Sequence, residues 1–210
     1  MTAIEKSAKR HDSEPEKLRR MEPFTRDDLQ LIRAFMRSTN ASTRDRALLE
    51  VGVDSMLRCG DLLRLRISDV KDINGRIRTD LSYATKKTGA TINIGLTDKT
   101  RALLESLIRE EEKWEDDYLF TQDRQPHASS PLTEAAFRRI IKQWARAAHQ
   151  DPDNYSGHSL RRTKAVFLYR QTKDYEMIRV ALGHESLAHT IKYLGIKGKD
   201  AAMTARSFDL

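Results

Sequence analysis

The sequence predicts an α+β protein, a mostly α-helical domain that carries a small three-stranded antiparallel sheet. Through most of the 210 residues, apolar side chains recur at spacings of three and four, as they do in helices with one buried face. Between about residues 70 and 95, this pattern gives way to short β-favouring runs separated by Asn74-Gly75 and by the sequence KKTG. Both separators are turn signals. No repeat or internal linker divides the chain, so these elements belong to one domain.

The N-terminal part of the chain predicts an arm followed by helices. Residues 1–22 are polar and lack periodic apolar positions, so we expect a flexible arm there and a domain over 23–210. Thr25 is a good N-cap for the first helix, because acidic residues follow it in the first turn. A second helix is expected from about residue 44 to 59, and Asp61 is expected to cap a short third one over 62–67.

The rest of the chain predicts the sheet and five or six more helices. The runs 81–85 and 90–94 should pair, with Lys86 and Lys87 at the tip of the hairpin. Thr97 is the expected cap of the next helix, and Ser159 of a later one. Trp144, Phe167 and Tyr169 are interpreted as core aromatics. The later helices are expected over 132–149, 159–171, 174–182 and 186–194, with a last short one in the tail at 197–210.

The charge distribution favours an anionic partner. The net charge is +7, and residues 55–101 hold ten Lys or Arg against five acids, whereas residues 105–123 hold eight acids against two cations. A basic face opposed to an acidic one suits a protein that binds a polyanion, although ordinary surface patchiness produces the same pattern. The single cysteine, Cys59, excludes an internal disulfide framework. With no secretory signal and no long apolar run, the sequence predicts a cytoplasmic protein without a membrane partner.

Four residues near helix ends form the most informative cluster. His158 and Arg161 lie three positions apart, so a helix places them on one face. His184 follows a second loop at Gly183, and Tyr193 lies nine residues beyond it. Each residue alone fits a blander interpretation as a turn residue, a solvated charge or a core aromatic. Together they are suited to holding a phosphate group.

Four separated motifs carry a resemblance to a known family. The sequence contains, in this order, MLRCGDLLRLRISDV, ATKKTGATINI, HSLRRTKA and LGHESLAHTIKYLGI. They resemble the motifs of the tyrosine recombinases, also called phage integrases, and the resemblance covers the chain from about Phe24 to Ile196. It implies the DNA breaking-rejoining fold of that family. It also implies a site-specific recombinase of mobile genetic elements that integrates, excises or inverts DNA through a 3′-phosphotyrosyl intermediate.

The resemblance also assigns roles to residues. Arg58, Arg161 and His184 would stabilise the charge on the phosphate, and Tyr193 would be the nucleophile. His158 would act as a base or an orienting group, and Lys87, with Lys86 as the alternative, would protonate the leaving 5′-oxygen. Asp61 would either orient Arg58 or cap the helix that follows. The residues expected to contact DNA phosphates are Lys86, Arg162 and Lys164.

The chain departs from the family pattern at several positions. Met56 replaces a glycine, Asp61 a glutamate, Gly95 a proline, and Arg162 the second histidine of the HxLRH motif. The last change leaves the role of Arg162 open. The polar N-terminus is too short for the helical clamp domain of most members. The sequence therefore resembles a catalytic domain alone, similar to the short fimbrial phase-switch recombinases.

The resemblance implies partners as well. They are double-stranded DNA recombination sites, other copies of the chain (a dimer on each site and a tetramer at synapsis) and accessory DNA-bending proteins, in a nucleoid-associated cytoplasmic protein. The phosphotyrosyl bond conserves the energy of the phosphodiester, so neither ATP nor a metal cofactor is implied. Two other functions stay open: a type IB topoisomerase-like enzyme that relaxes a single duplex, and a non-catalytic DNA-binding regulator.

Overall fold

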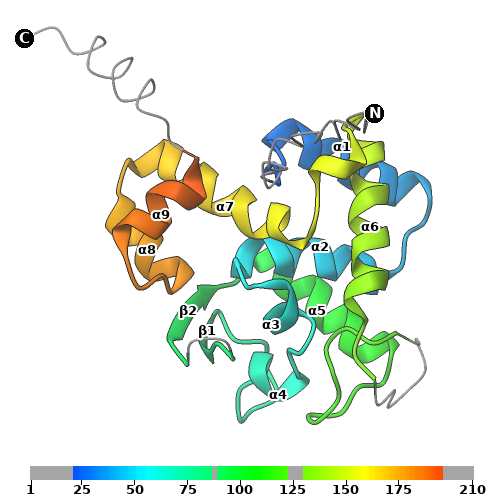
Figure 1. The fold of residues 1–210 in the computed structure, drawn as a ribbon. Helices are drawn as coiled ribbons and strands as arrows, with labels where there is room; N and C mark the ends of the chain where they lie inside the picture. Colours follow the sequence, from blue (N-terminus) through cyan, green and yellow to red (C-terminus); the bar gives the residue numbers. More distant parts are fainter. Residues whose placement is uncertain (1–20, 87–88, 123–129, 196–210) are drawn as a thin grey trace, which may run out of the picture.

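The computed structural model describes residues 21–86, 89–122 and 130–195. Three expectations therefore lie outside the described residues: most of the arm over 1–22, the position of Lys87, and the tail over 197–210. The elements, labelled in Figure 1, are α1 (Arg26–Ser38), α2 (Thr43–Ser55), α3 (Cys59–Leu62), α4 (Ile67–Val70), β1 (Asp80–Ala84), β2 (Thr91–Gly95), α5 (Asp98–Glu110), α6 (Glu134–Ala147), a 3-10 turn η1 (Pro152–Asn154), α7 (Gly157–Thr172), α8 (Tyr175–Leu182) and α9 (Leu187–Leu194).

Helix α2 lies at the centre of the main core. It packs against α5, α7 and β2, while α1 packs against α6 (Figure 1). Ala47, Leu48, Leu49 and Val51 of α2 are completely buried. This packing on several sides explains why most positions of α2 are buried, whereas α1 buries only the apolar stripe along one of its faces.

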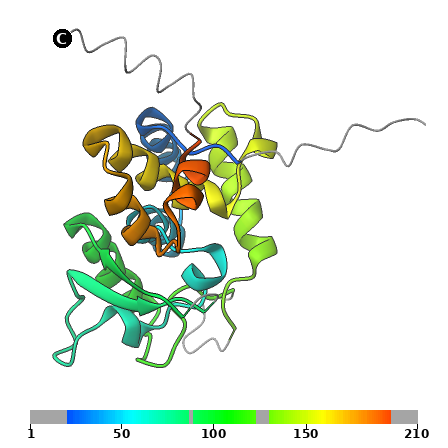
Figure 2. The same ribbon diagram turned by 60° about the vertical axis from the view of Figure 1, so that its left-hand side comes forward.

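A second, smaller core lies at the C-terminal end of the fold. Met56 meets Ala165 of α7, Ile178 and Leu182 of α8, and Leu194 of α9 there. Helix α8 also packs on β2. In Figure 1 α8 and α9 lie beside the main body and α7 runs from them toward α2, and Figure 2 shows α8 and α9 above the hairpin. The last two sequence motifs are thereby brought against the first two.

The sheet is smaller than the sequence predicts. Strands β1 and β2 pair antiparallel, with Leu81 opposite Ile94 and Tyr83 opposite Ile92, and these four side chains are buried. The prediction of a third strand is wrong for the described residues, where the sheet has two strands. The preceding segment adds only the antiparallel bridge between residues 71 and 77. The reason is that α4 already takes up residues 67–70, which leaves too short a run to pair.

Two of the predicted helix caps are confirmed and two are wrong. Thr25 and Thr97 cap α1 and α5 through their side chains. The cap of α7 is Ser156, whose hydroxyl accepts a hydrogen bond from the His158 N–H at 3.2 Å. Ser159 lies in the first turn and closes the capping box, because its hydroxyl accepts from the Ser156 N–H at 3.0 Å. Asp61 caps no helix, since α3 ends at residue 62 and α4 begins only at 67.

The three aromatics that the sequence assigns to the core differ in burial. Trp144 is buried in the main core, and Tyr169 is half-buried against the smaller one. Phe167 is 45% exposed, so its assignment to the core is wrong. It lies on α7 at the edge of a cavity that α1, α2 and α7 form, and no further helix of the described chain covers this face.

Gly183 is the tightest point between α8 and the hairpin. Its φ of +61° is in the left-handed region, and a Cβ there would lie 2.7 Å from Ile92 Cγ2. Gly183→Ala is therefore expected to lower the unfolding free energy by about 2–4 kcal/mol, from backbone strain plus overpacking. Urea denaturation measures this loss. Gly75→Ala is the matched control, because Gly75 has a φ of +77° but nothing within 4 Å, so it should lose only about 1 kcal/mol. Equal losses would contradict the close contact.

Candidate active site

Arg58 is positioned by a sharp turn at the end of α2. Met56 ends that helix in the left-handed conformation, with φ 49°, so that the chain reverses and Arg58 precedes α3. The Nη1 atom of Arg58 is buried and has no hydrogen-bond partner among the described residues. A buried guanidinium nitrogen without a partner is costly, and its position here leaves one strong donor available to a ligand.

Arg161 is the most enclosed charge of the cluster. It is 2% exposed, and its guanidinium donates hydrogen bonds to the carbonyl oxygens of Met56 and Leu182, the latter at 2.7 Å. Met56 lies two residues before Arg58, and Leu182 two residues before His184. Arg161 therefore joins the two turns that carry the other candidate residues. Its pKa is lowered by burial, but a guanidinium stays charged in proteins.

His184 and Tyr193 lie against each other beside this arginine. Their ring centroids are 5.2 Å apart, with the planes at 82°, and Arg161 Cζ lies 5.9 Å from the Tyr193 ring centroid. His184 Nδ1 lies 3.1 Å from the hydroxyl of the fully buried Thr190, on the same helix as the tyrosine. The Tyr193 hydroxyl is buried, and among the described residues it has no hydrogen-bond partner of good geometry.

Burial controls the protonation of both rings. It raises the pKa of Tyr193 to about 12, although the charges of Arg161, Arg162 and Arg58 oppose this shift. Burial also lowers the pKa of His184 to about 4, and here the charges of Arg161 and Arg58 act in the same direction. Without a ligand, the phenol is therefore protonated and the imidazole neutral at neutral pH.

His158 is more exposed than the other residues of the cluster. It is exposed in the first turn of α7, one turn before Arg161. It lines a cavity of about 220 Å³ together with Cys59, which follows Arg58, and Arg138 of α6. Burial raises the pKa of the Cys59 thiol to about 12, so the thiol stays protonated. The structure thus brings Arg58, Arg161, His184 and Tyr193 together and places His158 at the neighbouring rim.

Asp61 ties the hairpin to the arginine turn, a contact that the sequence does not reveal. Its carboxylate is 5% exposed and accepts a hydrogen bond from the backbone N–H of Lys86 at 3.1 Å. This is neither of the two roles expected for it. The Lys86 side chain is exposed, and Lys87 lies outside the described residues. Asp61 therefore fixes where the hairpin tip begins.

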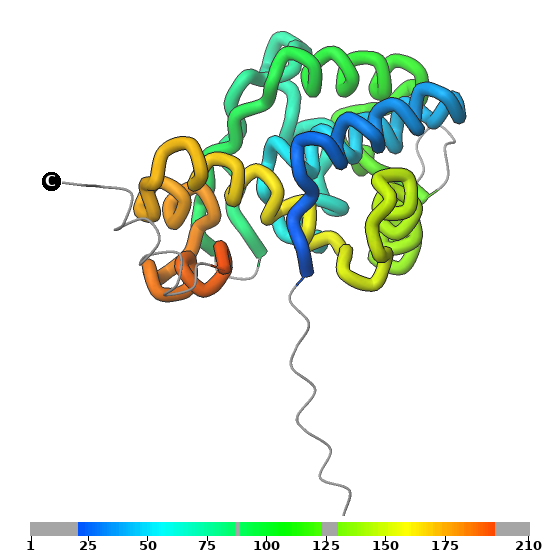
Figure 3. The backbone as a smooth tube through the Cα atoms, turned by 90° about the horizontal axis from the view of Figure 1, so that it is seen from above, coloured from blue at the N-terminus to red at the C-terminus, as the bar shows by residue number. Residues whose placement is uncertain are grey.

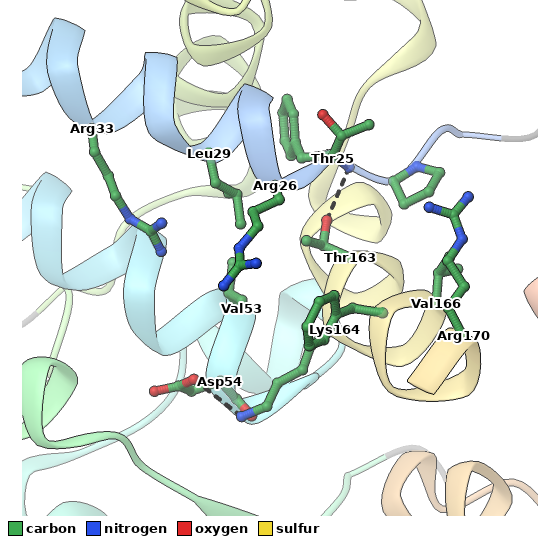
Figure 4. Close-up of a pocket in the computed structure, with 13 residues that line it drawn as sticks. Thr25, Arg26, Leu29, Arg33, Val53, Asp54, Thr163, Lys164, Val166 and Arg170 are labelled. Atoms are coloured by element: carbon green, nitrogen blue, oxygen red, sulfur yellow. Dashed lines mark hydrogen bonds and ion pairs between the residues drawn. The ribbon is translucent and has the colours of Figure 1, made fainter. Parts of the chain in front are cut away.

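The sequence predicts that Arg162 and Lys164 contact DNA phosphates, but in the structure both side chains have partners within the protein. Arg162 is 7% exposed and donates to the carbonyl oxygens of Met21 and Leu194. Lys164 pairs with Asp54 at 3.0 Å, as Figure 4 shows. Both cations are thus engaged within the protein. A DNA contact by either stays a prediction, and it would require the side chain to leave these partners.

The depressed pKa of His184 predicts a dependence of stability on pH. Because its folded pKa of about 4 lies below the ordinary histidine pKa of 6.5, the neutral ring stabilises the fold above pH 6.5. This contribution is lost as the pH falls toward 4. Between pH 7 and 4.5 the wild type should lose about 1–2 kcal/mol more unfolding free energy than His184→Asn, after allowance for solvent screening.

Urea denaturation at the two pH values measures this difference. His149→Asn is the matched control, because His149 is exposed after α6 and is not among the groups that lower the pKa of His184. It should leave the pH dependence unchanged. If His184→Asn retains the wild-type pH dependence, the low pKa of His184 is contradicted.

The sequence as a whole matches a known family model. The model described as the phage integrase family matches residues 22–198. The chain belongs to the phage integrase family. A relative from Bacillus subtilis (strain 168), named "Probable integrase/recombinase YoeC", is 30% identical over 177 residues, which are 81% of this chain and 86% of that protein.

Other integrase relatives are longer than this chain. The tyrosine recombinase XerD of Yersinia pestis is 29% identical over 155 residues, which cover 71% of this chain and 49% of XerD. A crystal structure of the XerH recombinase bound to its difH substrate aligns with a TM-score of 0.68 and 21% identity, covering 87% of this chain and 53% of XerH. The chain thus spans about half the length of these two relatives, and the XerH likeness shows the fold.

These comparisons confirm the family, the mostly helical recombinase fold with a small antiparallel sheet, and the enzyme class of site-specific tyrosine recombinases that the motifs predict. The roles of the individual integrase residues stay predictions. No helix in the described part of the chain is long and apolar enough to cross a membrane.

Proposed function

We propose that this chain cleaves and rejoins double-stranded DNA at specific sites through a 3′-phosphotyrosyl bond to Tyr193. One observation carries the proposal: Arg58 Nη1 and the Tyr193 hydroxyl are buried in one cationic cluster with Arg161, and neither makes a hydrogen bond of good geometry to any described residue. A bound phosphodiester would supply acceptors to the guanidinium and an electrophile to the phenol.

In the proposed step, one ester bond to phosphorus forms and another breaks, so the phosphate remains a diester. The Tyr193 oxygen forms a bond to phosphorus, and the bond from phosphorus to the 5′-oxygen breaks. Arg58, Arg161 and His184 stabilise the charge on the non-bridging oxygens. Arg161 is already held by two carbonyls, so its position is fixed before DNA arrives.

Proton transfer is assigned to the flanking residues. The phenol has a pKa of about 12, so it needs a base to release its proton at neutral pH. His158 is the proposed base, because it is exposed at the rim one turn from Arg161. The lysine at the hairpin tip, Lys87 or its neighbour Lys86, is proposed to protonate the leaving 5′-oxygen. A 5′-hydroxyl from a second DNA strand then reverses the step and completes the exchange.

The proposal extends to partners. The XerH structure contains its DNA substrate, and this chain has a net charge of +7 that favours DNA. Exchange between two duplexes requires an active site at each cleaved strand. We therefore propose a dimer on each site, a tetramer at synapsis, help from DNA-bending proteins, and a cytoplasmic, nucleoid-associated place of action.

A recombination assay tests the function. A supercoiled plasmid that carries two copies of the DNA flanking the gene is incubated with the protein, without metal or nucleotide. Recombinant products that disappear with Tyr193→Phe are expected. Relaxation of any plasmid without strand exchange would instead indicate a topoisomerase-like enzyme. Binding without either reaction would indicate a regulator, and both outcomes would overturn the proposal.

A further inference from the structure

Arg162 occupies a position between the start of the described chain and the helix that carries the tyrosine. It follows Arg161 on α7, but its guanidinium is directed elsewhere: Nη1 donates to the Met21 carbonyl oxygen, and Nη2 lies 3.5 Å from the Leu194 carbonyl oxygen. Its Cζ lies 5.9 Å from the Tyr193 ring centroid. One buried side chain thus contacts both segments.

The segment at Met21 is held firmly against α7 and the loop before it. The Glu22 N–H donates to the Asn154 carbonyl at 2.9 Å, and the Phe24 N–H donates to the Thr163 hydroxyl at 3.0 Å, the second of which Figure 4 shows. The Phe24 ring stacks on Tyr155 with centroids 4.4 Å apart. In Figures 2 and 3 this segment, coloured blue, runs beside the yellow start of α7.

The contact on the other side is at the end of the nucleophile helix. Leu194 is the last residue of α9 and directly follows Tyr193, and Gly195 ends the helix with φ 84°. The last carbonyls of a helix lack partners within the helix, and a cation there is favoured by the helix dipole. Arg162 supplies both a donor and a charge at this helix end.

We propose that Arg162 is a positioning residue that couples the chain entering at Met21 to the placement of Tyr193. When the entering segment lies on α7, Arg162 bridges it to Leu194 and fixes the end of α9. A pull on that segment, from whatever precedes it or binds it, would shift the guanidinium and with it the nucleophile. The effect of this coupling on catalysis rests on the proposed function. The bridge from Met21 through Arg162 to Leu194 does not.

The alternative is that Arg162 contacts a DNA phosphate directly. To do so, the side chain would have to abandon two carbonyl acceptors and leave a site in which it is 7% exposed. The two alternatives predict different effects of removing the Arg162 charge: a phosphate contact predicts weaker DNA binding, and an internal bridge predicts unchanged binding. A residue that neutralises a phosphate contributes about one unit to the salt dependence of binding, whereas an internal bridge contributes none.

The test compares Arg162→Gln, Arg162→Lys and the control Arg170→Gln, which removes one exposed charge from the same helix. Hydrogen exchange by mass spectrometry is measured on the full chain without DNA, where activity plays no part. In Arg162→Gln, amides in residues 21–25 and 190–195 should both exchange at least tenfold faster, with α5 unchanged. Arg162→Lys should restore part of the protection, and Arg170→Gln should behave as wild type.

Binding and single-turnover cleavage of nicked DNA are measured on the same proteins. Arg162→Gln should bind DNA with wild-type affinity and salt dependence, and should cleave about 10²-fold more slowly, because small misplacement of a nucleophile is costly. Weaker binding with a salt slope reduced by about one, and with unchanged exchange, would overturn the proposal in favour of a phosphate contact. Faster exchange in only one segment would overturn the coupling.

If Arg162→Gln does not fold, Arg162→Lys decides by the same criteria. Absence of cleavage by the wild type would contradict the proposed function, while the exchange data would still confirm or refute the bridge.

Discussion

Tyr193→Phe is expected to lose all DNA cleavage and to be more stable than the wild type. Cleavage is lost because the nucleophilic oxygen is removed. Stability rises because the wild-type hydroxyl is buried and makes no hydrogen bond of good geometry to the described residues, and an unsatisfied buried hydroxyl costs about 1–3 kcal/mol. We expect a gain of about 1 kcal/mol, or a melting temperature about 2–4 °C higher for a chain of this length. Calorimetry and a cleavage assay measure the two effects.

Tyr175→Phe is the matched control for this substitution. The Tyr175 hydroxyl accepts a hydrogen bond from that of Tyr169 at 2.7 Å, and Tyr175 also packs against the smaller core. Removal of this hydroxyl should cost about 1 kcal/mol and leave cleavage intact. A Tyr193→Phe that is destabilised to the same degree as Tyr175→Phe would show that the Tyr193 hydroxyl has a partner in the DNA-free protein.

Substitutions of Arg58 and Arg161 are expected to have similar effects on DNA cleavage but different effects on stability. Arg161→Met removes Nη1, which donates to the Met56 carbonyl, and Nη2, which donates to the Leu182 carbonyl, so the unfolding free energy should fall by about 3–5 kcal/mol. Arg58→Met removes a side chain whose buried Nη1 has no partner, so stability should stay within about 0.5 kcal/mol of the wild type. Both variants should cleave DNA at least about 10²–10³-fold more slowly.

Denaturation and single-turnover cleavage of both variants measure this separation. The comparison is sharp because both substitutions remove the same charge and leave the same apolar side chain. A loss of stability in Arg58→Met equal to that in Arg161→Met would contradict the different anchoring of the two residues. Wild-type cleavage by Arg58→Met would remove Arg58 from the proposed active site.

Much of the fold can be predicted from local signals in the sequence. The caps at Thr25 and Thr97 follow from a threonine before acidic residues or a helical pattern, and the structure contains both. The hairpin follows from the alternating residues on either side of KKTG, and the structure pairs these two runs antiparallel. These signals act over a few residues, so they depend little on the rest of the chain.

The errors arise where two local signals compete. Ser156 and Ser159 both suit an N-cap, and together they form a capping box in which only the first can precede the helix. Residues 67–70 suit either a strand or a turn of helix, and packing of α4 against β1 decides for the helix. Phe167 fits the helical apolar spacing of α7, but no described element covers that face.

The site was predictable in its members but not in its contacts. The spacing from His158 to Arg161 and from His184 to Tyr193 identifies the cluster, because a helix fixes which residues share a face. The contact of Asp61 with Lys86 joins residues 25 apart, and that of Arg162 with Met21 joins residues 141 apart. No periodicity links such positions, so only the folded structure reveals them.

The most direct test of the central claim is the chemical identity of the trapped intermediate. The protein is incubated without metal on nicked suicide DNA from its flanking sequences, the adduct is digested, and the DNA-linked peptide is sequenced by mass spectrometry. We predict a 3′-phosphate joined to the oxygen of Tyr193. A DNA link to any other residue, or intact DNA binding with no adduct, would contradict the assignment of Tyr193 as the nucleophile of this chain.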